Sequence, residues 1–147
     1  MFRGLNKMKK KFSNHIGYFV QEVARKSALP LNEELKPLGI TYSQFRVLNC
    51  ILKKGPMSQK EILKFVSVTP ATLTGTVDIL EKKKLVYRKA ESEDARTKII
   101  YLTEQGTNIQ KDAWSTVEKF EERTTGFLNK KERETVINAL KEMDKYI

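Results

Sequence analysis

Cysteine and histidine each occur once in this chain of 147 residues, as Cys50 and His15. A single cysteine excludes an internal disulfide framework and a cysteine-based zinc cluster, and it favours a reducing, cytoplasmic location. A metal site needs several ligands, and no second histidine or cysteine accompanies His15, so we expect no metal and no cofactor. We expect His15 to be partly buried at a subunit interface. Cys50 suits a buried apolar position, and redox sensing remains the alternative.

Long apolar runs and the signatures of enzymes are also missing. No stretch approaches the ~20 apolar residues of a membrane helix, and the short run "IGYFV" stops at Gln21, so we expect no targeting segment and no membrane partner. The chain has no glycine-rich phosphate loop, no paired catalytic acids in context and no metal-ligand spacing. These absences argue against an enzyme.

Acidic residues are fewer than basic ones. Lysine and arginine number 28 against 18 acidic residues, which gives a formal net charge of +10 and a pI near 9.7. Such a balance favours a polyanionic partner, nucleic acid more often than a membrane, although a basic surface without a partner is the alternative. The first eleven residues carry basic side chains and no acid, which is typical of an arm that contacts phosphate.

Helix signals dominate what is present. An apolar stripe from Phe12 to Val23 predicts a first helix that begins near residue 10 and is bent or ended by Pro30 and Pro37. Later helix starts are marked by Thr41 with Gln44, Ser58 with Glu61, Thr69 before Pro70, Thr103, and Asn129 with Glu132. The faces predicted to be buried carry Phe45, Leu48 and Leu52, then Ile62, Leu63 and Phe65, then Leu73, Val77 and Leu80.

One segment changes to the period of a strand. "LVYRKA" and "TKIIYL" are rich in β-branched and aromatic residues and flank "ESEDAR", which predicts a two-stranded ribbon with a charged loop. Two short capped helices joined by a tight turn and followed by a ribbon form a winged helix-turn-helix. We therefore expect a mainly α fold with a small β-wing, in which the second helix of the pair enters the major groove of double-stranded DNA.

The predicted recognition helix, residues 69–83, has an unusual outer surface. At 100° per residue, the positions opposite its apolar face are Ala71, Gly75, Asp78 and Lys82, flanked by Thr72, Thr74 and Ile79. Small side chains let a helix backbone approach base edges, and threonine offers a hydroxyl and a methyl group to them. The alternative is that the threonines are merely tolerated on the surface.

The stretch from Ser58 to Gly106 resembles the multiple antibiotic resistance regulator (MarR) family of transcription factors. The matching pieces are "SQKEILKFVSVTPATLTGTVDILEKKKLVYR", the wing "SEDART" and "LTEQG". The resemblance implies one domain over 1–147, with a winged helix-turn-helix at 41–102 and interlocking dimerisation helices at 10–38 and 103–147. It also implies a homodimer on a pseudo-palindromic operator, with repression relieved by a small-molecule effector or by oxidation.

The expected DNA-binding residues combine the facing argument with this resemblance. They are Ala71, Thr72, Thr74, Gly75, Lys82, Asp94, Arg96 and Lys98. The resemblance places Arg96 in the minor groove with Asp94 orienting it, while Lys98 is expected to reach phosphate at most. The run from Lys82 to Lys84 is either a solvated helix end or a set of phosphate contacts.

Two positions depart from the family pattern. Lys84 stands where the family often has a glycine that ends the recognition helix, so Lys84 must adopt a left-handed conformation or the turn differs. Ala95 stands where a second wing arginine is common. An alternative function, a winged helix for protein or RNA contact, would predict no basic wing. Residues 81–98 instead carry seven basic side chains against four acidic ones, which favours DNA.

Overall fold

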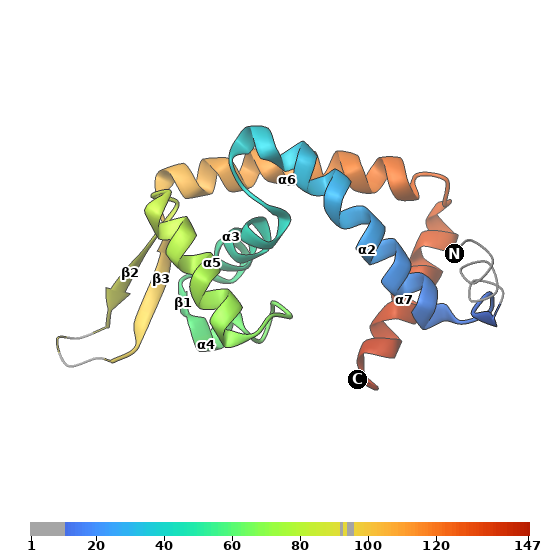
Figure 1. Ribbon diagram of the computed structural model, residues 1–147, viewed down its shortest axis with the longest axis horizontal. Helices are drawn as coiled ribbons and strands as arrows, with labels where there is room; N and C mark the ends of the chain where they lie inside the picture. The colour runs from blue at the N-terminus through green and yellow to red at the C-terminus, as the bar shows by residue number, and fades with distance from the viewer. Residues whose placement is uncertain (1–10, 92, 94–95) are drawn as a thin grey trace, which may run out of the picture.

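Helices make up most of the protein, and one small antiparallel sheet accompanies them (Figure 1). The computed structural model describes residues 11–91, 93 and 96–147. The elements in chain order are α2 (Ile16–Leu35), the 3-10 helix η1 (Lys36–Leu38), α3 (Tyr42–Lys54), β1 (Met57–Ser58), α4 (Gln59–Ile62), α5 (Pro70–Lys82), β2 (Val86–Ala90), β3 (Lys98–Leu102), α6 (Glu104–Thr125) and α7 (Lys130–Asp144).

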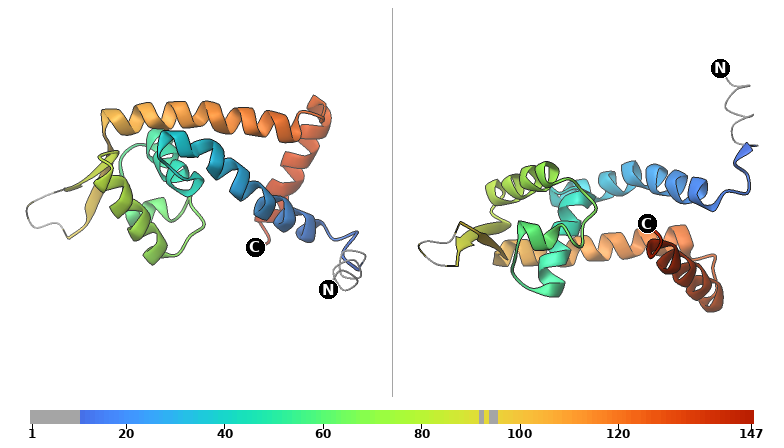
Figure 2. Two further views of the ribbon diagram at one scale, coloured as in Figure 1. Left: turned by 45° about the horizontal axis from the view of Figure 1, so that its top comes forward. Right: turned by 90° about the horizontal axis from the view of Figure 1, so that it is seen from below.

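The elements form an arch with the winged helix-turn-helix beneath one end of α6 (Figures 1 and 2). In Figure 1 helix α2 runs diagonally down from the middle of α6, and α7 descends from the end of α6 that lies away from the hairpin. The β2–β3 hairpin projects away from the helices at the end opposite to α7. Within the described part of the chain, no helix has both the length and the apolar character that a membrane crossing requires.

The predicted capping residues start their helices. Complete capping boxes occur at three N-termini, where Thr41, Ser58 and Asn129 each accept a backbone N–H three residues later and the N3 side chain bonds back. The Thr69 side chain accepts the N–H of Thr72 at 3.2 Å, with Pro70 at the first helical position. Since each cap satisfies backbone groups that have no partner inside the helix, these local signals define where the helices begin.

The first long helix differs from its prediction at its N-terminal end. It begins at Ile16, with His15 as its N-cap, rather than near residue 10. Pro30 lies inside α2, and the helix continues to Leu35 before Pro37 enters η1. The second proline, rather than the first, therefore marks the end of this helix.

The core of the winged unit is formed by the predicted apolar faces. Leu48, Ile62, Leu73, Val77, Leu80 and Ile100 are fully buried. The prediction of buried faces is wrong for two residues: Leu52 is 36% exposed and Phe65 is 46% exposed. Phe65 is exposed because α4 ends at Ile62, so the helical spacing that placed it inward no longer applies.

The sheet has three strands rather than the predicted two. Its order is β1-β3-β2, and the hairpin pairs Val86 with Leu102 through to Ala90 with Lys98. The additional strand, β1, has only two residues and pairs Met57 with Ile100. A strand of two residues is too short to show a period, so the sequence pattern missed it.

The turn between α5 and β2 explains two features of the sequence. Lys84 adopts the left-handed conformation, with φ of 60°. The backbone N–H of Thr103 donates to the carbonyl of Leu85 at 3.1 Å, and its hydroxyl donates to the carbonyl of Lys84 at 2.7 Å. A Cβ atom at Gly106 would lie 1.9 Å from the Leu85 carbonyl oxygen. The glycine of "LTEQG" thus lets α6 dock closely against this turn.

Replacing Lys84 with glycine should stabilise the protein. The strain of the left-handed conformation at a lysine exceeds the free energy by which the greater backbone freedom of glycine favours the unfolded chain. Lys84→Gly should therefore raise the free energy of unfolding by about 0.5–1 kcal/mol. Lys82→Gly, within α5, should lower it by up to about 1 kcal/mol. Urea unfolding of both variants measures the two effects, and destabilisation by Lys84→Gly would show that the lysine side chain stabilises this turn.

Candidate nucleic-acid interface

The outer face of α5 is exposed and carries mostly small side chains. Ala71, Thr72, Thr74, Gly75 and Lys82 are all exposed, whereas Leu73, Val77 and Leu80 on the opposite face are fully buried. No atom lies within 4 Å of the position that a Cβ atom would take at Gly75. A larger side chain would therefore fit at this position, and packing within the chain does not explain why residue 75 is glycine.

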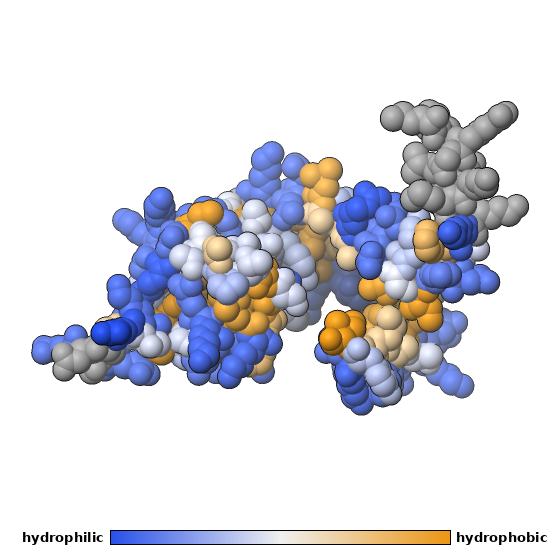
Figure 3. Space-filling model, turned by 60° about the horizontal axis from the view of Figure 1, so that its bottom comes forward, coloured by the Kyte–Doolittle hydropathy of each residue, from blue (hydrophilic) through white to orange (hydrophobic). Residues whose placement is uncertain are grey.

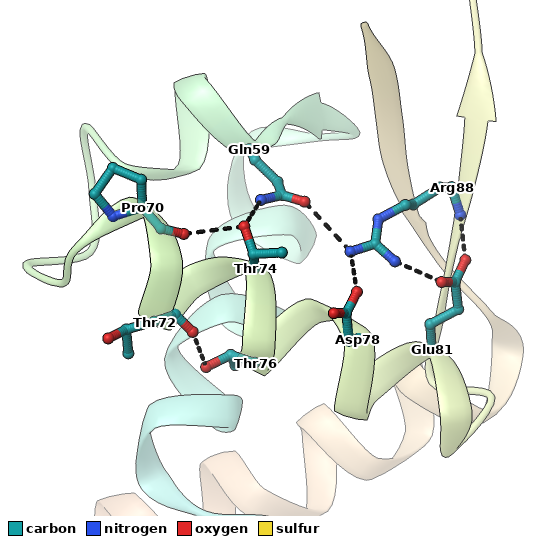
Figure 4. Close-up of polar contacts among 8 residues, drawn as sticks. All are labelled: Gln59, Pro70, Thr72, Thr74, Thr76, Asp78, Glu81 and Arg88. Atoms are coloured by element: carbon teal, nitrogen blue, oxygen red, sulfur yellow. Dashed lines mark hydrogen bonds and ion pairs between the residues drawn. The ribbon is translucent and has the colours of Figure 1, made fainter.

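The threonine hydroxyls of α5 are partly used inside the helix (Figure 4). Thr74 donates to the Pro70 carbonyl at 3.0 Å and accepts from Nε2 of Gln59 at 2.9 Å, and Thr76 donates to the Thr72 carbonyl at 3.0 Å. The hydroxyl of Thr72 accepts from Thr69 at 2.9 Å. No described residue accepts the hydroxyl hydrogen of Thr72, so Thr72 retains a donor and Thr74 does not.

A cluster around Arg88 joins the hairpin to α5, and the sequence prediction missed it. The guanidinium donates to Oδ1 of Asp78 at 2.6 Å, to Oε2 of Glu81 at 2.5 Å and to Oε1 of Gln59 at 3.3 Å (Figure 4). Its side chain is only 16% exposed. Burial would lower the pKa of Arg88, but the bonds to Asp78 and Glu81 outweigh burial and raise this pKa above its ordinary value.

The Arg88 cluster gives Asp78 a partner within the chain. Asp78 is exposed on the outer side of the recognition helix, as predicted, and its carboxylate is paired with Arg88 at the root of the wing. Gln59 bonds both to Arg88 and to Thr74, so the cluster extends from β2 across α5 to α4. A signal for Arg88 was present: it lies two residues after buried Val86 in β2, so both side chains point to the same side of the strand.

The hairpin carries exposed basic side chains towards its tip. Arg96 and Lys98 are exposed, and Lys98 begins β3 opposite Ala90. Asp94 and Ala95 lie outside the described residues, as do residues 1–10 of the basic N-terminal stretch. The pairing of Asp94 with Arg96 and the phosphate-contacting arm therefore remain predictions.

The three lysines that follow α5 have different surroundings. The ammonium of Lys83 donates to the Gly39 carbonyl at 2.5 Å and to Oε1 of Gln44 at 3.1 Å. Lys82 is exposed and forms no hydrogen bond or ion pair with a described residue. Lys84 forms the left-handed turn. Lys83 is thus bonded within the chain although it is exposed, and phosphate contact by this run remains a prediction.

An open groove of about 950 Å³ lies between α3 and α6. Its lining combines aromatic rings, basic side chains and acidic side chains: Tyr42, Phe45, Arg46, Asn49, Cys50, Lys53, Lys54, Phe65, Val66, Trp114, Val117, Glu118, Glu121, Glu122 and Arg133. Two ammonium groups lie over rings of the groove, Lys53 at 5.1 Å from the Trp114 centroid and Lys54 at 4.5 Å from that of Phe65.

Cys50 is buried beside this groove, as predicted for a small apolar residue. Its sulfur lies 3.9 Å from the sulfur of Met57. Burial raises the pKa of the Cys50 thiol, and the charge of Lys54 opposes this only partly. A raised pKa keeps the thiol protonated, which disfavours the thiolate that redox sensing requires.

A winged helix-turn-helix with an exposed second helix and a basic hairpin is the architecture of a DNA-binding transcriptional regulator. The model of the MarR family matches residues 40–98. The HTH-type transcriptional regulator YwoH of Bacillus subtilis is 36% identical over 110 residues, which are 75% of this chain and 80% of that protein. The chain belongs to the MarR family of transcriptional regulators.

Two further comparisons agree with this assignment. The HTH-type transcriptional repressor NicR of Pseudomonas putida is 26% identical over 131 residues, covering 89% of this chain and 83% of that protein. The crystal structure of a MarR variant from E. coli complexed with operator DNA superposes with a TM-score of 0.79 at 31% identity. This superposition covers 90% of this chain and 96% of that one.

Removing the guanidinium of Arg88 should loosen the wing from α5. Arg88→Met keeps much of the side-chain volume but leaves Asp78 and Glu81 without their cation, so the free energy of unfolding should fall by about 1–2 kcal/mol. Lys89→Met removes the same charge from an exposed neighbour on β2 and should change stability by less than about 0.5 kcal/mol. Urea unfolding compares the two variants, and equal effects would mean that the cluster adds nothing beyond net charge.

Proposed function

We propose that this protein is a sequence-specific transcriptional regulator, rather than an enzyme, that acts as a repressor in the cytoplasm by binding a pseudo-palindromic operator as a homodimer. The observation that carries the proposal is the exposed, small-residue face of α5, with open space around Gly75, beside a basic hairpin. Membership in the MarR family and the similarity to the repressor NicR support it.

Each interface residue has a proposed part in binding. The small side chains of Ala71 and Gly75 let the α5 backbone approach the major groove, where Thr72 donates to a base edge. Thr74 offers its methyl group, because its hydroxyl hydrogen is already bonded to the Pro70 carbonyl. The remaining residues act through charge: Lys82 and Lys98 contact phosphates, Arg96 enters the minor groove, and Asp94 orients it.

The proposed homodimer follows from apolar surface that the single chain leaves uncovered. Ile16, Phe19, Val20 and Val23 on α2 are exposed, as are Val136, Ile137 and Leu140 on α7. Apolar side chains gather on the α2 and α7 end of the arch (Figure 3). A second copy related by a two-fold axis would bury these faces. Residues 10–38 and 103–147 would then join the protomers, leaving 41–102 to bind DNA.

Adding a carboxylate to the outer face of α5 tests this function. Gly75→Glu should fold, because its side chain meets open space. Its free energy of unfolding should be unchanged or higher by up to about 1 kcal/mol, because glycine is unfavourable within a helix. Affinity for a duplex that the unaltered protein selects from a random pool should fall more than about a hundredfold, because the carboxylate meets phosphate and base acceptors.

Ser115→Glu is the charge-matched control for this experiment. Ser115 is exposed on α6, so the substitution adds the same negative charge to the protein at a position away from α5. We expect this variant to retain at least about a third of the affinity, because its charge lies outside the helix proposed to enter the groove and salt screens exposed charges. Equal losses for the two variants, or no loss for Gly75→Glu, would exclude α5 as the recognition helix.

The groove between α3 and α6 is the proposed effector site. The charges of Arg46, Lys53 and Lys54 have no ion-pair partner among the described residues, and the rings of Phe65 and Trp114 lie beside them. Basic groups next to aromatic faces suit a small aromatic anion. Because the groove lies against α3 and α6, its ligand could shift the winged unit relative to the dimerisation helices and so relieve repression.

Benzoate is a simple probe of this site, because Trp114 is the only tryptophan and its fluorescence reports on the groove. Benzoate should change the Trp114 emission saturably, and the neutral analogue benzyl alcohol should bind more weakly. Lys54→Met should weaken benzoate binding about fivefold through loss of a charge-assisted contact. Lys60→Met, an exposed lysine outside the groove, should leave it unchanged, and equal binding of both probes would contradict an anion site.

A further inference from the structure

The side chain of Lys83 connects the end of α5 to the end of η1. Lys83 is the C-cap of α5, and its ammonium reaches the Gly39 carbonyl at 2.5 Å and Oε1 of Gln44 at 3.1 Å. Lysine near the carbonyl end of a helical segment both donates a hydrogen bond and complements the partial negative charge there. This contact joins residues that are 44 and 39 positions apart in the chain.

Both acceptors belong to a well-anchored junction. Gly39 closes η1 with φ of +71°, and its neighbours in the junction, Leu35 and Ile40, are buried. Gln44 is only 7% exposed, and its Oε1 also accepts the backbone N–H of Thr41 in the capping box of α3. The junction links α2 directly to α3, so the position of Lys83 is defined relative to the proposed dimerisation helix.

We propose that Lys83 is a positioning residue that sets the direction of the recognition helix relative to α2, and thereby the half-site spacing that the dimer accepts. This inference rests on the proposed function, because spacing matters only for a dimer on two half-sites. In such a dimer, α2 relates one protomer to the other, while α5 relates each protomer to its half-site. A bond from the end of α5 to the junction that follows α2 therefore limits how far the two recognition helices can turn apart.

The neighbouring lysine provides a matched comparison. Lys82 belongs to the same helix end and carries the same charge, but it forms no hydrogen bond or ion pair within the described chain. A phosphate contact at Lys82 would contribute counterion release, and its loss would reduce the salt slope by about one. Lys83 should contribute less of this release, because its ammonium, although exposed, already donates to the Gly39 carbonyl and to Oε1 of Gln44.

The experiment uses the full chain and a duplex selected from a random pool by the unaltered protein. Lys83→Met, Lys82→Met and Lys83→Arg are compared on this duplex, on versions with the half-sites moved one base pair closer or farther, and on random duplex DNA. Lys83→Met should lower affinity for the selected spacing about tenfold, keep the salt slope, and bind the three spacings more equally. Lys83→Arg should retain the preference for the selected spacing, because a guanidinium can donate to both acceptors.

A double-mutant cycle separates positioning from general stability. Gln44→Met removes one acceptor of Lys83, so its effect on spacing preference should be largely absent in the Lys83→Met background. If Lys83→Met does not fold, Lys83→Gln takes its place, since its shorter amide cannot reach both acceptors. A salt slope reduced as in Lys82→Met, or additive effects with Gln44→Met, would overturn the inference. Failure of the unaltered protein to select any duplex would instead overturn the proposed function.

Discussion

The bond between Arg88 and the acidic side chains of α5 is the interaction on which the candidate interface depends. Helix α5 is held on its inner face by buried Leu73, Val77 and Leu80, and the hairpin by buried Val86 and Ile100. Arg88 joins β2 to Asp78 and Glu81, so the two elements proposed to meet different grooves of DNA have a defined relation. Because the guanidinium is largely buried and geometrically rigid, a lysine could not satisfy the same two carboxylates equally well.

The contacts around α5 explain how this helix tolerates several threonines. Threonine is a weaker helix former than alanine, and Gly75 weakens the helix further, so α5 depends on other contributions. Thr69 caps it, Pro70 begins it, and the buried inner face holds it against the core. The hydroxyls of Thr74 and Thr76 bond to carbonyls one turn earlier, which satisfies them without any bulky outer side chain. The same threonines can therefore satisfy their hydroxyls within the helix and still leave its outer face small enough for close approach to DNA.

Local signals predicted the fold well, and contacts between distant segments were where prediction failed. Capping residues such as Thr41 and Ser58 act within four positions, so the sequence contains the whole interaction. For Lys84, the family resemblance left a left-handed conformation or a different turn open, and the left-handed conformation is the one observed. The partners of Arg88 and Lys83 depend on how β2 and η1 pack against α5, and no spacing within one element reveals this packing. The DNA-binding roles themselves remain predictions, and Asp94 lies outside the described residues.

These internal bonds also change what the basic composition means. Residues 81–98 contain seven basic side chains, which favoured DNA as the partner when only the sequence was considered. Arg88 is paired with Asp78 and Glu81, and the Lys83 ammonium donates to Gly39 and Gln44, so two of the seven already have partners within the chain. Since the salt dependence of DNA binding counts only the charges that displace counterions, a count from composition overstates it. Under the role proposed for Lys83, this cation acts on specificity by aligning the recognition helix, whereas Arg88 acts on stability by joining β2 to α5.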